Sequence, residues 1–264
     1  MIASRFKSVS CLVMVLLLVG GCGSSGGFNL VSIEEEWQLG NQLAADIARQ
    51  MPLLQDPAAL AYVNEVGQRL VAQTSMANLP WRFYIVAEND VNAFVIPGGH
   101  VYVNVGLIAA ADTASELVGV LAHEISHGVA RHATQQLSRA YGLQVVAALV
   151  LGQNPAIYQQ ILAQILGTGA MASFSREAER EADMMGVRVM YDAGYNPNGM
   201  VTMFEELLSR QARQPGSVER FFSTHPLTQD RIRDVSNEIA RLPAKANLVS
   251  DTTAYQSFRQ RVTR

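Results

Sequence analysis

The chain has 264 residues, of which 49% are hydrophobic and 16% are charged, and its formal net charge at pH 7 is -3. This composition indicates a globular protein, because a disordered chain is poorer in apolar residues and richer in net charge. The acidic balance and the lack of a basic cluster argue against nucleic acid as a partner.

The first residues have the pattern of an export signal. Arg5 and Lys7 precede an apolar run over residues 11–19, and small residues follow up to Cys22. A basic start, a short apolar stretch and small residues at its end are typical of a secretory signal peptide. The run is shorter than the roughly 20 apolar residues that a membrane-spanning helix needs.

The sequence VGGC at Cys22 resembles the lipobox of bacterial lipoproteins. The resemblance implies a lipoprotein signal peptide over 1–21 and a lipid on Cys22. The small and polar residues that follow indicate a flexible tether over 22–31, and we expect a single domain over 32–264. The residue after the cysteine is not the aspartate that marks inner-membrane retention, which favours the outer membrane. An ordinary signal peptide with a coincidental cysteine is the alternative.

Helix caps and residue periodicity divide the rest of the chain. Ser32 with Glu35, and Thr113 with Glu116, have the spacing of capping boxes that open helices. In chain order we expect helices at 32–51 and 56–72, strand-like runs at 81–87 and within 92–104, a helix at 113–132, a helical hairpin within 142–172, and helices at 174–193, 197–213, 228–241 and 254–262. The fold class is therefore α+β and mainly helical, with a small sheet or hairpin before the helix at 113–132.

The apolar segment 142–172 is a candidate membrane element, but it is broken by Gly152, by Asn154-Pro155 and by several glutamines. Neither half is long and apolar enough to cross a bilayer. We therefore expect it to cover part of the body of the protein.

The sequence HEISH places His123 and His127 four residues apart on the helix at 113–132. Residues at i and i+4 project from one face of a helix, so both imidazoles can reach a single zinc ion. Glu124 follows the first histidine and can take a proton from a water molecule that the metal activates. A surface helix with incidental histidines is the alternative, and it fits poorly with a capped helix that follows a sheet.

A catalytic zinc site needs a third protein ligand. The glycine and third histidine of the extended metalloprotease pattern are absent, since positions 130 and 133 are both alanine. His132 lies five residues beyond His127, on the wrong side of a continuous helix. The ligand must therefore come from another segment, and a carboxylate is expected.

The sequence SREAEREADMMG at 175–186 offers two pairs of acidic residues at helical spacing. Glu179 and Asp183 continue along a face of small and apolar residues, whereas Glu177 and Glu181 lie on a mainly charged face. The pattern thus favours Glu179 as the third metal ligand. Asp183, one turn further, is placed to accept a hydrogen bond from the second nitrogen of a ligand histidine.

The chain contains four motifs in the order NAFVIPGGHVYV, HEISH, a helical ExxxD and THPLTQDRI. This ordered set resembles the peptidase family of the CAAX prenyl endoprotease and HtpX. The resemblance covers roughly residues 34–240. It implies a zincin-like core with one zinc ion held by His123, His127 and Glu179, and Glu124 as the general base. Spanning helices, which the integral-membrane members carry, are not evident, so the chain looks like a periplasmic lipoprotein branch.

The sequence STHPLTQDRIRD at 223–234 adds His225, just outside a helix that Thr228 caps, and Arg231 in its first turn. A cation at a helix N-terminus opposes the helix dipole, so we expect an anionic partner for Arg231. The matching residues of the resembled family lie at the active site. They imply catalytic roles for Arg231 and for His225, which would donate to the oxyanion of the scissile carbonyl. Because His225 is the histidine left that could fill the open position of the zinc, we also expect it near or on the metal in a resting state. A loop histidine with a solvated arginine is the alternative.

These features predict a zinc endopeptidase for misfolded or unassembled envelope proteins, anchored through Cys22 on the periplasmic face of the outer membrane. The outer-membrane assembly machinery is a candidate partner. A strand within 92–97 or 100–104 could pair with an extended substrate if it lies at a sheet edge. The alternatives are a chaperone-like factor that binds clients in the same cleft with little proteolysis, and a zinc hydrolase that acts on another bond. The presence of Glu124 favours the enzyme, because binding alone needs no base there.

Overall fold

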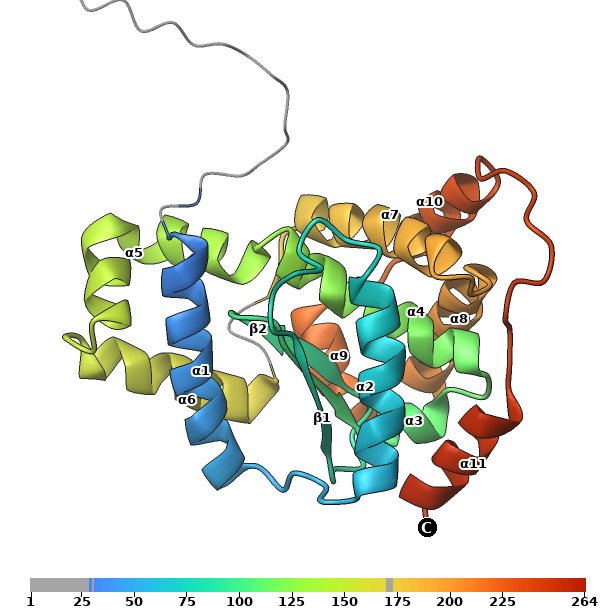
Figure 1. Cartoon of the computed structure of the whole chain (residues 1–264), viewed down its shortest axis with the longest axis horizontal. Coiled ribbons are helices and arrows are strands. Elements are labelled where there is room, and N and C mark those ends of the chain that lie inside the picture. Colours follow the sequence, from blue (N-terminus) through green and yellow to red (C-terminus); the bar gives the residue numbers. More distant parts are fainter. Residues whose placement is uncertain (1–28, 30, 170–172) are drawn as a thin grey trace, which may run out of the picture.

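A computed structural model describes residues 29, 31–169 and 173–264 of the chain. The described part is mainly helical and contains one small sheet (Figure 1), as the sequence predicts. The predicted signal peptide over 1–21, the lipidation site at Cys22 and most of the tether lie outside the described residues.

The sheet has three strands, β1 (Arg82–Val86), β2 (Ala93–Ile96) and β3 (His100–Asn104), in the order β1-β3-β2. The central strand β3 pairs parallel with β1 and antiparallel with β2. Gly98 and Gly99 make the tight turn from β2 to β3, with φ angles of 80° and 71°. Glycine adopts these positive angles without the backbone strain that a side chain would cause. Of the two strand segments considered for substrate pairing, 100–104 is internal, whereas 92–97 contains a strand at one edge of this sheet.

The helices follow the expected order. They are α1 (Ile33–Gln50), α2 (Pro57–Val71), α3 (Val105–Ala110), α4 (Ala114–Val129), α5 (His132–Val150), α6 (Pro155–Thr168), α7 (Arg176–Asp192), α8 (Asn198–Arg213), α9 (Glu219–Thr224), α10 (Gln229–Ile239) and α11 (Thr253–Val262), with a short 3-10 helix at Pro215–Ser217. The two six-residue helices α3 and α9 are not evident in the sequence, because they are too short to show a helical period.

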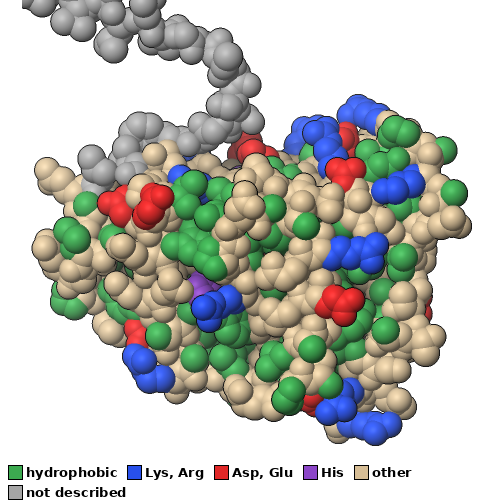
Figure 2. Space-filling model, viewed as in Figure 1, with side chains coloured by type: hydrophobic (Ala, Val, Ile, Leu, Met, Phe, Trp, Pro, Cys, Tyr) green, Lys and Arg blue, Asp and Glu red, His purple; other side chains and the backbone are tan. Residues whose placement is uncertain are grey.

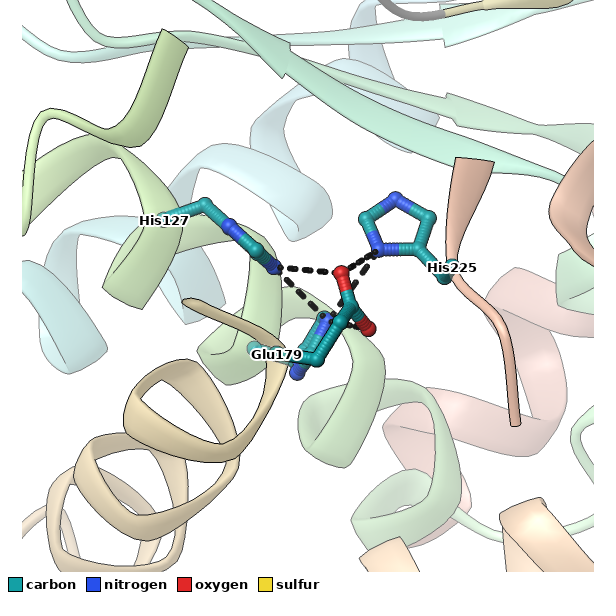
Figure 3. A group of neighbouring side chains, drawn as sticks. His127, Glu179 and His225 are labelled. Atoms are coloured by element: carbon teal, nitrogen blue, oxygen red, sulfur yellow. Dashed lines mark hydrogen bonds and ion pairs between the residues drawn. The ribbon is translucent and has the colours of Figure 1, made fainter. Parts of the chain in front are cut away.

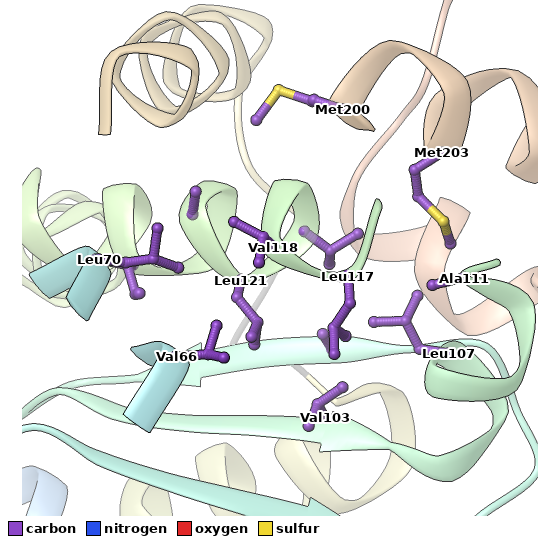
Figure 4. Packing of buried hydrophobic residues seen from close by; sticks show 14 of the residues in the cluster. Val66, Leu70, Val103, Leu107, Ala111, Leu117, Val118, Leu121, Met200 and Met203 are labelled. Carbon is purple, nitrogen blue, oxygen red and sulfur yellow. The ribbon is translucent and has the colours of Figure 1, made fainter. Parts of the chain in front are cut away.

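Helix α4 is the central helix of the larger core. Its Leu117 and Leu121 point toward the sheet, where they meet Val103 (Figure 4). Met200 and Met203 of α8 approach α4 from the other side (Figure 4). Because full burial of a leucine or methionine side chain contributes about 1.5–3 kcal/mol, these contacts hold α4 firmly between the sheet and α8.

Helices α1, α5 and α6 cover the opposite face of the sheet. Tyr102 stacks between Tyr84 and Phe94, with ring centroids 4.7 Å apart on both sides. The apolar residues of α5 and α6 pack against this face and against α1, so the segment 142–168 belongs to the body of the protein as expected. Among the described residues, no helix combines the length and the apolar character that crossing a membrane requires.

The boundary between α4 and α5 differs from the prediction of a helix to about His132. Helix α4 ends at Val129, and the chain turns at Arg131, whose φ of 59° lies in the left-handed region. The Arg131 guanidinium donates to the buried Glu36 carboxylate at 2.6 Å and to the Val31 carbonyl at 2.6 Å. These contacts with the start of α1 stabilise a conformation that a non-glycine residue adopts only at a cost.

The face of the molecule shown in Figure 2 carries both signs of charge without a dominant patch. On the face shown in Figure 2, basic and acidic side chains are scattered singly or in small groups among polar and apolar ones. This distribution agrees with the absence of a basic cluster in the sequence, and this face does not have the electrostatic footprint of a nucleic-acid-binding protein.

Candidate metal centre

Helix α4 places the two histidines of HEISH side by side. A capping box of Thr113 and Glu116 opens the helix. The side chains of His123 and His127 lie one turn apart and are both buried. Their Nε2 atoms are 3.1 Å apart, so both rings present the same nitrogen to the same point.

Helix α7 brings a carboxylate to this point. Ser175 caps the helix, and Glu179, one turn further, is buried against α4. Its Oε1 lies 3.3 Å from His127 Nε2, and its Oε2 lies 3.6 Å from His123 Nε2. Glu177 of the same helix is exposed. The structure therefore groups Glu179, and not Glu177, with the histidines.

His225 completes the cluster from a third segment, the junction between α9 and α10. Its Nδ1 lies 3.0 Å from Glu179 Oε1 and 3.3 Å from His123 Nε2. Figure 3 shows the His127 ring, the Glu179 carboxylate and the His225 ring converging from different elements. The His225 side chain is completely buried in this position.

The four side chains lie close enough together to hold one metal ion. His123, His127, Glu179 and His225 each offer one ligand atom, and these atoms all lie within 4.8 Å of one another. The close pairs are 3.0–3.6 Å apart. Adjacent ligand atoms around zinc are expected about 3.4 Å apart, since each bond is about 2.0–2.1 Å long. The spacing is thus that of ligands around one ion.

The charges of the site also call for a cation. Glu124, Glu179 and Asp183 are buried carboxyl groups, and Arg231 is the one buried guanidinium in contact with this group among the described residues. A buried carboxylate without a partner is costly, so three such groups beside one arginine leave a deficit of positive charge. A divalent metal ion would balance it.

Glu124 lies beside the cluster without a hydrogen bond. It is fully buried, and neither of its carboxyl oxygens has a hydrogen-bond partner among the described residues. Burial raises the pKa of this carboxyl, while the facing His225 and His123 rings oppose the rise. Its Oε1 is 3.5 Å from Nε2 of His225. A buried carboxyl next to the ligand atoms is suited to exchanging protons with a molecule bound there.

Asp183 and Arg231 support the ligands from behind. Asp183 Oδ1 lies 2.9 Å from His123 Nδ1, the ring nitrogen that faces away from the cluster. Arg231 donates to both oxygens of Asp183 at 2.7 and 2.8 Å, and its Nη1 lies 2.6 Å from Oε2 of Glu179. Burial opposes the ionisation of Asp183, but the bonds from Arg231 and His123 outweigh it and lower the pKa of that carboxyl. The anionic partner expected for Arg231 is therefore this pair of carboxylates.

Two residues near the site had no assigned role in the sequence. His132 begins α5, and its Nδ1 lies 2.9 Å from Nδ1 of His127. Phe174 stacks on the His127 ring, with centroids 4.0 Å apart. The sequence shows a histidine near HEISH, but the contact depends on the turn at Arg131, which local periodicity does not reveal.

A surface cleft of about 580 Å³ lies next to the cluster, and Glu179 is the clustered side chain that lines it. Glu179 and Arg231 lie on its inner wall, and Phe174 and Pro226 lie beside them. Arg180 and Arg233 from α7 and α10 line the cleft as well, paired with the acidic residues Asp234 and Asp230.

Comparisons with known proteins identify relatives of the chain. A family model described as peptidase family M48 matches residues 57–239. The beta-barrel assembly-enhancing protease of Escherichia coli (strain K12) is 35% identical over 224 residues, which are 81% of this chain and 46% of that protein. The protein of the same name from Yersinia pestis is 33% identical over 231 residues, 83% of this chain and 47% of that protein.

A eukaryotic relative also matches. The mitochondrial metalloendopeptidase OMA1 of Schizosaccharomyces pombe is 30% identical over 223 residues, which are 83% of this chain and 65% of that protein. The chain spans about half the length of the two bacterial relatives.

Proposed function

The chain belongs to peptidase family M48, and from this premise we propose that it is a zinc-dependent endopeptidase of the bacterial envelope. Membership confirms the resemblance indicated by HEISH and the motifs around it. The main observation in support of the proposal is the buried cluster of His123, His127 and Glu179 with Glu124 beside it. We propose misfolded or unassembled envelope proteins as substrates and the assembly machinery as a partner, and the reference to assembly in the name of the bacterial relatives, beta-barrel assembly-enhancing protease, supports this choice.

In this proposal His123 and His127 bind zinc through Nε2, and Glu179 binds it through its carboxylate. Zinc at this position would supply a nucleophile at neutral pH, because it lowers the pKa of a water molecule. Glu124 accepts the proton from that water at a carboxylate oxygen and later passes it to the leaving amine. No side chain in the described part of the protein donates a hydrogen bond to Glu124, so its carboxylate can take part in this exchange.

Asp183 and Arg231 act on the ligands rather than on the substrate. Asp183 accepts the Nδ1–H of His123, which fixes the ring with Nε2 toward the metal. Arg231 holds Asp183 and Glu179 together, and its Nη1 also donates to the Pro226 carbonyl at 3.0 Å. Its donors are therefore used within the protein, and we assign it a positioning role.

We also propose that the conformation with His225 at the cluster is a resting state. Nδ1 of His225 lies at ligand distance from the other donors, and its Nε2 faces Glu124. A fourth protein ligand fills the coordination position that a catalytic zinc site keeps open for water. The junction between α9 and α10 must therefore move His225 away before hydrolysis begins. The alternative role for this ring is to donate to the oxyanion of the scissile carbonyl.

Strand β2 is the candidate for pairing with a substrate backbone. It lies at a sheet edge next to α4, and the backbone of Val95 faces the Glu124 carboxyl. An extended peptide added to such an edge gains main-chain hydrogen bonds that do not depend on its side chains. This mode of binding suits a protease that acts on unfolded segments of many sequences.

The proposed location rests on the N-terminal sequence. We propose that residues 1–21 are removed as a signal peptide, that Cys22 carries the lipid, that 22–31 is a tether and that 32–264 is one domain. The VGGC sequence supports this assignment. The protein would then lie on the periplasmic face of the outer membrane.

The direct experiment compares wild type with Glu124→Gln. Both proteins should bind zinc, and only wild type should cleave an unfolded protein substrate, because an amide cannot accept the proton. Glu177→Gln, an exposed change on α7, should cleave as wild type does. Equal cleavage by Glu124→Gln would contradict the assignment, whereas a wild type that binds unfolded protein without cleaving it would support the chaperone-like alternative.

A further inference from the structure

His132 lies directly behind the metal cluster although it is not one of its ligands. It is the first residue of α5, and its side chain is 4% exposed. The left-handed turn at Arg131 directs the start of α5 back onto α4. As a result His132 Nδ1 lies 2.9 Å from Nδ1 of His127, on the side of that ring opposite the cluster.

The direction of this hydrogen bond follows from the metal. A neutral imidazole carries one proton, and a ring that binds a metal through Nε2 carries that proton on Nδ1. His127 Nδ1 must then donate, and His132 Nδ1 must accept. A neutral His132 therefore holds its own proton on Nε2, which lies 3.4 Å from Oε2 of Glu181.

We propose that His132 and Glu181 form a positioning chain that orients His127 for metal binding. The inference rests on the proposed zinc site. In the chain, His127 donates to His132, and His132 donates to Glu181 on α7. Ligand histidines usually donate their second ring N–H to a carboxylate, a carbonyl or a water, and such partners fix the ring and raise its basicity. Here a neutral histidine takes that place.

The two ligand histidines thus have different support. His123 Nδ1 lies 2.9 Å from Asp183, a buried carboxylate that Arg231 holds through two hydrogen bonds. His127 reaches its carboxylate only through His132, and the Glu181 side chain is 39% exposed. The support of His127 is therefore weaker than that of His123 and extends to the surface, where His132 and Glu181 line a depression of about 380 Å³.

Zinc affinity, measured by competition with a chelator, tests the chain without depending on catalysis. His132→Ala should bind zinc roughly 10–100-fold more weakly, the usual effect of losing such a partner. His132→Asn should stay within a few-fold of wild type, because the amide oxygen takes the place of Nδ1 as acceptor. Glu181→Gln should weaken binding by only a few-fold, and Glu177→Gln, an exposed change one turn away, should have no effect.

Denaturant unfolding of the zinc-free variants separates a positioning role of His132 from a packing role. His132→Ala and His132→Asn should have similar free energies of unfolding without zinc and differ only in zinc affinity. If the two variants weaken zinc binding equally, or if His132→Ala binds as wild type does, the chain does not position His127. A wild type that binds no zinc would instead refute the metal site itself.

The ring tautomer provides a test that needs no substitution. In zinc-loaded wild type with ¹⁵N-labelled histidine, NMR should show His132 protonated at Nε2 and bare at Nδ1. Protonation at Nδ1 would overturn the proposal, because that nitrogen could then not accept from His127.

Discussion

Asp183 Oδ1 lies 2.9 Å from His123 Nδ1, on the side of the ring away from the metal cluster. Because this carboxylate fixes the ring, Asp183→Ala should keep the fold but weaken zinc affinity by roughly 10–100-fold. A chelator titration measures the change, and Glu177→Ala on the exposed side of the same helix serves as the control. Unchanged affinity in Asp183→Ala would show that the contact contributes only packing.

Arg231 should matter for stability as well as for the metal. Arg231→Met leaves the buried carboxylates of Asp183 and Glu179 without their shared partner. Breaking a buried ion pair from one side costs about 3–5 kcal/mol, so the free energy of unfolding should fall by that amount in a urea titration. Arg233→Met, two residues along α10, removes an exposed pair with Asp230 and should cost less than about 1 kcal/mol. If Arg231→Met lowered the free energy of unfolding by no more than Arg233→Met does, the proposed role of Arg231 would be refuted.

His225→Ala tests the resting state. The variant should retain zinc through the three remaining ligands, and its turnover of an unfolded substrate should exceed that of wild type, because the fourth position is then open. Zinc content and initial rates measure the two effects. A fall in turnover of roughly 10²–10³ would instead assign His225 to the oxyanion.

The buried His100 should make stability depend on pH. Its Nε2 lies 3.2 Å from Asn41 Oδ1, and its Nδ1 lies 3.0 Å from the Tyr84 hydroxyl. Burial, with the nearby Arg82 charge, lowers the pKa of His100 from 6.5 to about 4. Between these values the unfolded chain binds a proton that the folded protein does not, so stability falls as the pH falls from 6.5 to about 4.

The size of this effect is measurable by denaturant unfolding at several pH values. The shift corresponds to about 3 kcal/mol. His100→Gln lacks the titrating group. As the pH falls from 6.5 to about 4, the free energy of unfolding of wild type should therefore fall by about 3 kcal/mol relative to that of the variant. A difference that stays constant with pH would contradict the prediction.

Gly40 allows α1 to approach the turn between β2 and β3. A Cβ at position 40 would lie 1.9 Å from the Pro97 carbonyl oxygen, a contact that forces the helix away. Gly40→Ala should therefore lower stability by about 1–3 kcal/mol in thermal unfolding, although alanine favours helices. Gly167→Ala in α6 meets no atom within 4 Å and should be neutral or stabilising by up to about 1 kcal/mol. Equal effects of the two changes would refute the steric argument.

Local sequence patterns were sufficient for most of the fold. The capping boxes at Ser32 and Thr113 mark where α1 and α4 begin, because the caps involve residues only three positions apart. The apolar face that continues from Glu179 through Gly186 indicates which side of α7 is buried. The inward orientation of Glu179 could thus be predicted from the sequence.

The contacts that the sequence did not reveal depend on residues far apart in the chain. Arg131 ends α4 early because it binds Glu36, 95 residues away, and no helical period indicates this contact. The position of His132 behind His127 follows from that turn, and a continuous helix would have placed it elsewhere. The ligand-distance approach of His225 likewise depends on the packing of α10 against α7.

The most direct measurement of the central claim is anomalous X-ray diffraction at the zinc edge from crystals of the zinc-loaded protein. It should show one strong peak per chain, about 2.0–2.1 Å from Nε2 of His123, from Nε2 of His127 and from a carboxylate oxygen of Glu179. A peak that is not bound by these three residues, or no peak in protein that contains stoichiometric zinc, would contradict the account.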